Sequence, residues 1–149
     1  MAGYGVHATK KKFIEYIEKK LRKTIREQGG LKKDETVVCS DFTYTVLKRI
    51  LNLPFKRGDK GTVILDWFLE DEVDLFLQDI SKTPHKEPQG IKLYLHLEYD
   101  TIKTYAQAIK ETPPQKEFSN RIQRLEKLQA LYPETKHALL KTIQKLKGN

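Results

Sequence analysis

The spacing of apolar residues changes along the chain, and each spacing predicts a different element. In residues 10–28 the apolar side chains recur every three or four positions, as on one face of a helix. They are Phe13, Ile14, Ile17, Leu21 and Ile25. We expect Gly29-Gly30 to end this helix, because glycine adopts the left-handed cap conformation without steric cost.

A strand and a second helix are expected next. Residues 36–39 are a mostly β-branched run that is typical of a buried strand. Ser40 or Asp41 can then cap a helix, because their side-chain oxygens accept hydrogen bonds from the first free amides. Pro54 is expected to stop that helix.

The middle of the chain predicts a loop, a strand and an acidic helix. Residues 55–61 are expected to form a basic loop, and residues 62–65 a strand. Residues 69–80 have the pattern of an amphipathic helix. Its buried side is expected to carry Val73, Phe76, Leu77 and Ile80.

The clearest strand pattern covers residues 91–99, where apolar and polar residues alternate. The apolar set is Ile91, Leu93, Leu95, Leu97 and Tyr99, and the other set is Lys92, Tyr94, His96 and Glu98. We expect the first set to be buried and the second to be half exposed. Asp100 can then cap a helix that reaches about Lys110.

Two closing helices, residues 118–131 and 134–147, are expected on either side of Tyr132-Pro133. Strands separated by helices predict an α/β fold. We expect a small layered domain with a short, mostly parallel sheet flanked by helices, ending in a helix pair. At 149 residues the chain is predicted to be a single domain over residues 1–149.

The charge of the chain permits contact with nucleic acid but does not establish it. The formal net charge is +8, yet only six of the 28 basic side chains are arginine, the residue best suited to bidentate phosphate and base contacts. Basic side chains concentrate in residues 10–33 and 116–147, whereas residues 66–81 carry six carboxylates and no base. These blocks allow nucleic-acid contact without requiring it.

Cellular location follows from what the chain lacks. Cys39 is the only cysteine, so an internal disulfide cannot form. No apolar run approaches the roughly 20 residues needed to span a bilayer. Residues 1–12 have no apolar core typical of a secretory signal. We therefore expect a soluble, cytoplasmic protein that contacts no membrane.

Motifs for catalysis are absent, so we expect no enzyme activity, no cofactor and no metal site. The chain has neither glycine-rich phosphate loop, and its four histidines are scattered. Cys39 could be an activated thiol near a helix start, but a small buried apolar role is favoured.

Two groups of residues are candidates for contact with nucleic acid. Lys56, Arg57 and Lys60 lie in a glycine-containing basic segment that could hold phosphate, and the alternative is a solvated turn. Tyr94 and His96 could stack on bases, and the alternative is a strand face covered by a helix.

The closing helices carry a pattern that resembles a known family. Pro133-x-Thr135, Thr142 and Lys145-Leu146 are similar to the C-terminal end of the cytoplasmic tRNA 2-thiolation protein 2 family. Ile122, Leu125, Leu128 and Gln129 fall where that family's penultimate helix has apolar and Gln positions. Further similarities in the same order are Cys39-Ser40-Asp41, Lys56-Arg57-Gly58, Ile91-Lys92, Ile102 and Tyr105-Ala106.

This resemblance implies a non-catalytic subunit of a tRNA wobble-uridine 2-thiolation complex. Such a subunit forms a heterodimer with a catalytic, ATP-dependent thiolation subunit, and here Lys56, Arg57 and Lys60 would help to bind tRNA. The chain departs from related catalytic subunits, because it lacks their Ser-Gly-Gly-x-Asp-Ser loop and cysteine pairs, and Leu93-Tyr94-Leu95 replaces a Pro-Leu-Arg. It is therefore expected to be a divergent, short relative. The alternative is a stand-alone basic module that binds nucleic acid or protein without modification chemistry.

Overall fold

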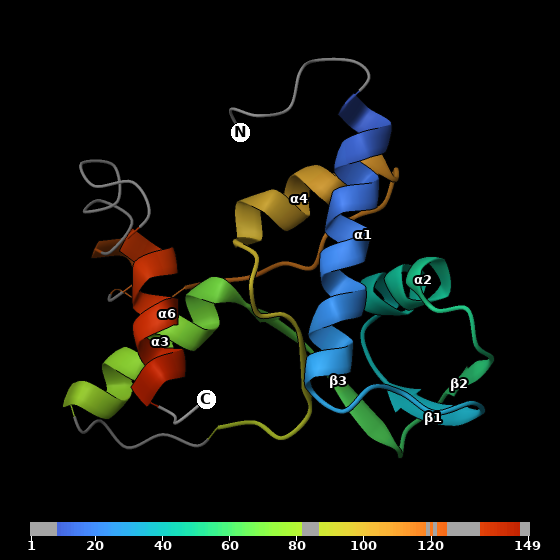
Figure 1. Ribbon diagram of the computed structural model, residues 1–149, viewed down its shortest axis with the longest axis horizontal. Helices are drawn as coiled ribbons and strands as arrows, with labels where there is room; N and C mark the ends of the chain where they lie inside the picture. The colour runs from blue at the N-terminus through green and yellow to red at the C-terminus, as the bar shows by residue number, and fades with distance from the viewer. Residues whose placement is uncertain (1–8, 82–86, 119, 121, 125–134, 147–149) are drawn as a thin grey trace.

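The protein folds into a small α/β domain with a four-stranded, all-parallel sheet flanked by helices, as the computed structural model shows (Figure 1). The structure describes residues 9–81, 87–118, 120, 122–124 and 135–146. The strands are β1 (Glu35–Val38), β2 (Phe55–Arg57), β3 (Thr62–Phe68) and β4 (Ile91–Tyr94). The predicted fold class is confirmed.

The order of the strands reverses in the middle of the sheet. Their spatial order is β2-β1-β3-β4, and every neighbouring pair is parallel. The chain therefore moves from β1 to one edge, returns to the other side of β1, and then continues to the opposite edge. In doubly wound sheets such a reversal separates two strands at their carboxyl ends, where ligands usually bind.

The described helices are α1 (Thr9–Glu27), α2 (Asp41–Ile50), α3 (Leu69–Ser81), α4 (Tyr99–Ala108) and α6 (Thr135–Leu146). The predicted end of α1 is confirmed, because Gly29 and Gly30 have φ angles of 106° and 71°. The amide of Gly30 donates to the carbonyl of Ile25 at 2.9 Å, which closes the last turn. Of the two predicted caps of α2, the structure uses Ser40, whose Oγ accepts from the amide of Thr43.

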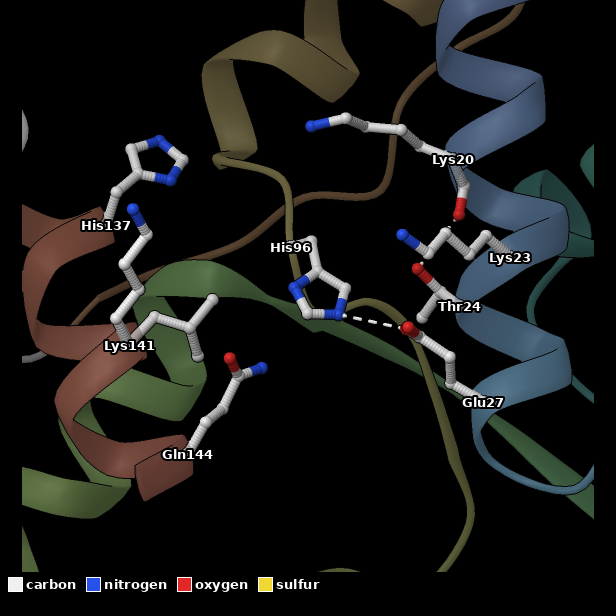
Figure 2. Close-up of a pocket in the computed structure, with 9 residues that line it drawn as sticks. Lys20, Lys23, Thr24, Glu27, His96, His137, Lys141 and Gln144 are labelled. Carbon is white, nitrogen blue, oxygen red and sulfur yellow. Dashed lines mark hydrogen bonds and ion pairs between the residues drawn. The ribbon is translucent and has the colours of Figure 1, made fainter. Parts of the chain in front are cut away.

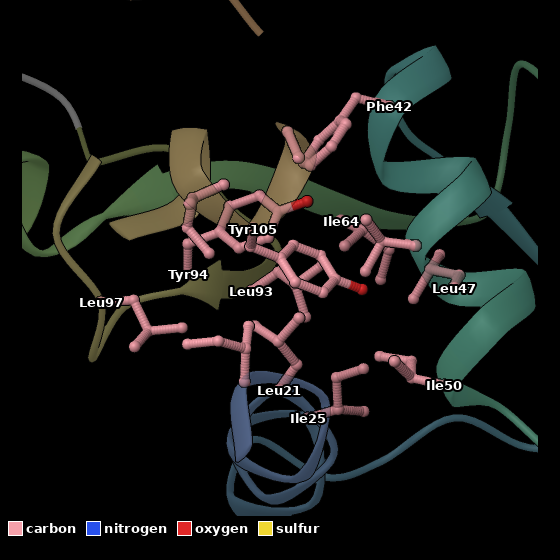
Figure 3. Packing of buried hydrophobic residues seen from close by; sticks show 14 of the residues in the cluster. Leu21, Ile25, Phe42, Leu47, Ile50, Ile64, Leu93, Tyr94, Leu97 and Tyr105 are labelled. Carbon is pink, nitrogen blue, oxygen red and sulfur yellow. The ribbon is translucent and has the colours of Figure 1, made fainter. Parts of the chain in front are cut away.

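The main core lies between the sheet and α1, α2 and α4. Ile17 and Leu21 of α1 are fully buried, which confirms the predicted apolar stripe. Figure 3 shows side chains from α1 and α2 converging with Leu93 and Tyr105. At roughly 1.5–3 kcal/mol per fully buried aliphatic or aromatic side chain, this cluster is the chief stabilising feature of the domain.

A second, smaller core joins α3 to α6, which lie side by side in Figure 1. It contains Leu69, Val73, Ile122, Leu140 and Ile143. The predicted helix 134–147 is confirmed as α6. Most of its predicted partner, residues 118–131, lies outside the described residues.

The predicted strand 91–99 is wrong in length and in exposure. β4 ends at Tyr94, a turn follows in which the amide of Leu97 donates to the carbonyl of Tyr94, and Tyr99 already begins α4. Lys92 and Tyr94 are buried, whereas the alternation predicted them half exposed. Both faces of β4 are covered, and Lys92 finds two carboxylates there.

Two strand boundaries and one exposure in the middle of the chain also differ from the prediction. The supposed loop 55–61 begins as edge strand β2, and β3 extends to Phe68. On α3, Val73 is buried as predicted and Phe76 and Leu77 are partly buried against the second core, but Ile80 is 63% exposed.

Asp100 does not cap α4, which begins one residue earlier and ends at Ala108. Its N-cap residue, Glu98, makes no side-chain cap bond. The amide of Tyr99 donates to the carboxylate of Glu70, at 3.0 and 3.2 Å. A carboxylate from α3 therefore satisfies this helix end through a long-range contact.

Within the described part of the chain, no helix combines the length and apolar character required to cross a bilayer.

Candidate functional site

The carboxyl end of β1 lies beside the reversal in strand order, where parallel α/β sheets usually bind ligands. The chain passes there through Cys39 and Ser40 into α2. Ser40 Oγ accepts from the Thr43 amide at 3.3 Å, and Asp41 occupies the first turn of α2, where a carboxylate complements the helix dipole. The chain's own side chains therefore occupy the helix end that binds anions in many doubly wound proteins.

A buried hydrogen-bonded cluster occupies the neighbouring space. Thr43 Oγ1 hydrogen-bonds Asp66 Oδ1 from β3 and lies 2.8 Å from Tyr94 Oη from β4. Thr43 and Tyr94 are fully buried, and the Tyr94 ring stacks on Phe68 with a centroid distance of 5.0 Å. Burial raises the pKa of Tyr94 well above its ordinary value, so the phenol stays protonated. The cluster therefore joins the first turn of α2 to β3 and to the end of β4.

Arg57 of β2 contacts the segment that joins β1 to α2. Its guanidinium donates to the carbonyl of Cys39 at 2.9 Å, forms an ion pair with Asp41 at 2.8 Å and lies 5.2 Å from the Tyr44 ring centroid. Arg57 is thus already engaged with α2.

The three residues predicted to bind tRNA are not gathered into one site. Lys56 and Lys60 are exposed, and Arg57 is directed towards Asp41. Because successive residues of a strand point to opposite faces, Lys56 lies on the face of the sheet away from Arg57. The structure places these residues on an edge strand and the turn after it.

Cys39 is half-buried and packs against the main core. Burial raises the pKa of its thiol, and the nearby Arg57 only partly opposes this effect. A raised pKa means little thiolate at neutral pH. These features suit the small apolar role favoured from the sequence.

A basic pocket lies on another part of the molecule, between α1 and α6 (Figure 2). Its volume is about 250 Å³. The described residues that line it are Lys20, Lys23, Thr24, Glu27, His96, His137, Leu140, Lys141 and Gln144. Figure 2 shows the side chains of the two helices facing each other across His96, which comes from the turn after β4.

The sequence could predict the basic face of each helix that lines this pocket, but not that the two faces lie opposite each other. Lys20 and Lys23 are three residues apart, and His137 and Lys141 are four apart, so each pair shares a helix face. Only the packing of α6 on α3 brings the two pairs together.

The scattered histidines and carboxylates form no metal centre in the part of the chain that the structure describes. No group of three or more His, Cys, Asp or Glu residues there could hold a metal ion.

The fold is a small α/β domain with an all-parallel sheet, and side chains of the chain itself occupy the carboxyl ends of its strands. A scan of protein-family models finds none that matches the chain, and a search of curated proteins finds no match either.

Proposed function

We propose that this protein is a non-catalytic subunit of a tRNA wobble-uridine 2-thiolation complex, in which it helps to hold tRNA for an ATP-dependent partner subunit. The observation that carries this proposal is the closed carboxyl edge. A doubly wound parallel sheet typically binds nucleotides there. Here Thr43, Asp66 and Tyr94 are hydrogen-bonded to one another at this edge, and Arg57 pairs with Asp41 of α2. Such a domain suits a relative of nucleotide-binding subunits that acts through a partner.

The tRNA contact is supported by a stripe of basic residues on α1. Lys12, Lys19, Lys23 and Arg26 are all exposed, and their spacing of seven, four and three residues places them on one helix face. Tyr16, which is 40% exposed, lies on the same face. We call these five residues the α1 stripe.

The chemistry of the α1 stripe suits the RNA backbone better than base edges. Three of its four basic residues are lysines, which contact phosphates as point charges. Phosphate contacts position a protein on a nucleic acid without reading its sequence. This fits a subunit that holds tRNA while its partner selects and modifies the nucleotide.

The tRNA contact is tested by measuring binding of purified tRNA to the full chain at several salt concentrations. We expect affinity to fall steeply between about 50 and 200 mM salt, because bound lysines release counterions from RNA. Lys12→Glu with Lys19→Glu should weaken binding and flatten the salt dependence.

Two matched variants control this measurement for net charge. Lys48→Glu with Lys110→Glu makes the same charge change at exposed positions outside α1, and we expect it to leave the salt dependence nearly native. Lys56→Glu with Lys60→Glu tests the predicted edge-strand contact by the same charge change. An equal effect of all three pairs would show that net charge alone attracts the RNA, and would remove the α1 stripe from the proposal.

A second candidate function is a stand-alone basic module that binds nucleic acid or protein. The observation that favours it is that the α1 stripe lies entirely on this chain and needs no partner to complete it. A stand-alone module would bind RNA in the same way, but its loss would leave tRNA thiolation unchanged.

A further inference from the structure

The pocket between α1 and α6 has the size and composition of a site for a small anion. Its volume of about 250 Å³ lies below the roughly 300–1,000 Å³ of pockets for drug-sized ligands. Those pockets are lined mainly by apolar side chains, whereas Leu140 is the single apolar residue among the described lining of this one.

Cationic and imidazole groups approach the pocket from both walls. Lys20 and Lys23 come from α1, and His137 and Lys141 come from α6, one helical turn apart (Figure 2). No ion pair within the described residues joins any of these three ammonium groups to a carboxylate. The ammonium of Lys20 lies 5.0 Å from the Tyr16 ring centroid, and those of Lys23 and Lys141 are available to a ligand.

His96 stands between the two walls in a defined orientation. Its Nε2 lies 3.4 Å from a carboxylate oxygen of Glu27, the one acidic residue among the described lining. Figure 2 shows that its other ring nitrogen faces α6. Glu27 thus orients the imidazole and is itself occupied by that contact.

We propose that this pocket binds a phosphate group. Phosphate presents several strong acceptor oxygens, so it can accept hydrogen bonds from lysines on both walls at the same time, and charge-assisted bonds of this kind are the stronger ones. The inference rests on the proposed function in one respect, which is that the phosphate belongs to the RNA backbone. Lys23 both lines the pocket and belongs to the α1 stripe, so the pocket and the stripe share a basic residue.

The pocket depends on how α6 is held. Leu140 lines the pocket and also belongs to the second core, together with Ile143. Lys141 and His137 therefore face α1 only while α6 packs on α3.

The test uses the full chain and pyrophosphate as the probe, followed by the NMR signals of the His96 and His137 rings. We expect saturable shifts of both rings. Lys23→Gln with Lys141→Gln should weaken binding by about tenfold or more, since each charged hydrogen bond contributes roughly that factor. Lys11→Gln with Lys145→Gln removes the same charge from exposed positions of the same helices, outside both the pocket and the α1 stripe, and should change binding by less than about threefold. No saturable shift, or equal weakening by both variants, would overturn the phosphate site.

Competition identifies the source of the phosphate. We expect single-stranded RNA to displace pyrophosphate from the two histidine signals. Pyrophosphate that stays bound when RNA is saturating would overturn RNA as the occupant and assign the pocket to a small phosphorylated molecule. In a separate titration without pyrophosphate, RNA binding that leaves both histidine signals unchanged would likewise exclude RNA from the pocket, but would leave the tRNA contact of the α1 stripe intact.

Discussion

At the scale of single residues, Lys92 shows most clearly where sequence patterns stop being informative. Its alternation with Leu93 correctly places the two side chains on opposite faces, but predicts the face of Lys92 to be half exposed. The side chain is instead 10% exposed, with Nζ 2.8 Å from carboxylate oxygens of Glu72 and Glu87 and 4.7 Å from the Trp67 ring. Glu72 lies in α3, so no pattern local to β4 could predict it.

Burial and pairing act on Lys92 in opposite directions. Burial alone would lower the pKa of Lys92, but hydrogen bonds from its ammonium to Glu72 and Glu87 outweigh burial and raise it. Because the folded pKa is raised, the stabilisation is complete at neutral pH and is lost as the pH rises through the folded pKa.

Replacing Lys92 should therefore destabilise the domain strongly. Lys92→Met removes the ammonium from the carboxylate of Glu72, which is 6% exposed, and we expect a loss of about 3–5 kcal/mol in the free energy of unfolding. The control is Lys103→Met, whose pair with Asp100 is exposed and should change stability by less than about 1 kcal/mol. Urea denaturation at pH 7 measures both. Similar small effects would mean that the buried ion pair contributes little.

At the scale of elements, the helices follow the sequence more closely than the strands do. The apolar stripe and glycine cap of α1 are local features, and both appear where the sequence predicts them. The end of β4 is set instead by two contacts with the start of α3. The carbonyl of Leu97 accepts from the amide of Leu69, and the carboxylate of Glu70 accepts from the amide of Tyr99. These contacts join distant segments, so alternation alone could not locate the boundary.

The attachment of α6 is the element-scale prediction. Ile143 is 2% exposed in the second core, and Ile143→Ala should cost about 2–5 kcal/mol of local packing. We expect faster amide hydrogen exchange in α6 and α3, with little change in α1 and the sheet, because the main core does not include Ile143. The exposed neighbour Thr142→Ala serves as the control. Equally faster exchange throughout the molecule would show that the two cores unfold as one unit.

At the scale of the whole molecule, the α/β class was predictable because strands and helices alternate along the chain. The candidate binding site was less predictable from the sequence. Lys56, Arg57 and Lys60 are adjacent in sequence, but Asp41 engages Arg57 and the strand separates it from Lys56. The pocket was not predictable, because α1 and α6 lie near opposite ends of the chain and meet through tertiary packing.

In the whole molecule, side chains of the chain itself occupy the carboxyl ends of the strands, and the basic residues of the α1 stripe are exposed. Under the proposed function, ATP chemistry would fall to the partner and both subunits would hold tRNA. A larger ATP-binding protein should then co-purify with this chain from its host.

The most direct measurement is the 2-thiouridine content of wobble positions in tRNA from a host strain that lacks this protein. Mass spectrometry of digested tRNA should show that the modified nucleoside is lost and that the native gene restores it. The doubly charge-reversed Lys12→Glu, Lys19→Glu gene should restore it poorly if the folded variant accumulates normally. Normal 2-thiouridine in the deletion strain would contradict the thiolation role, and the stand-alone basic module would then be the better description.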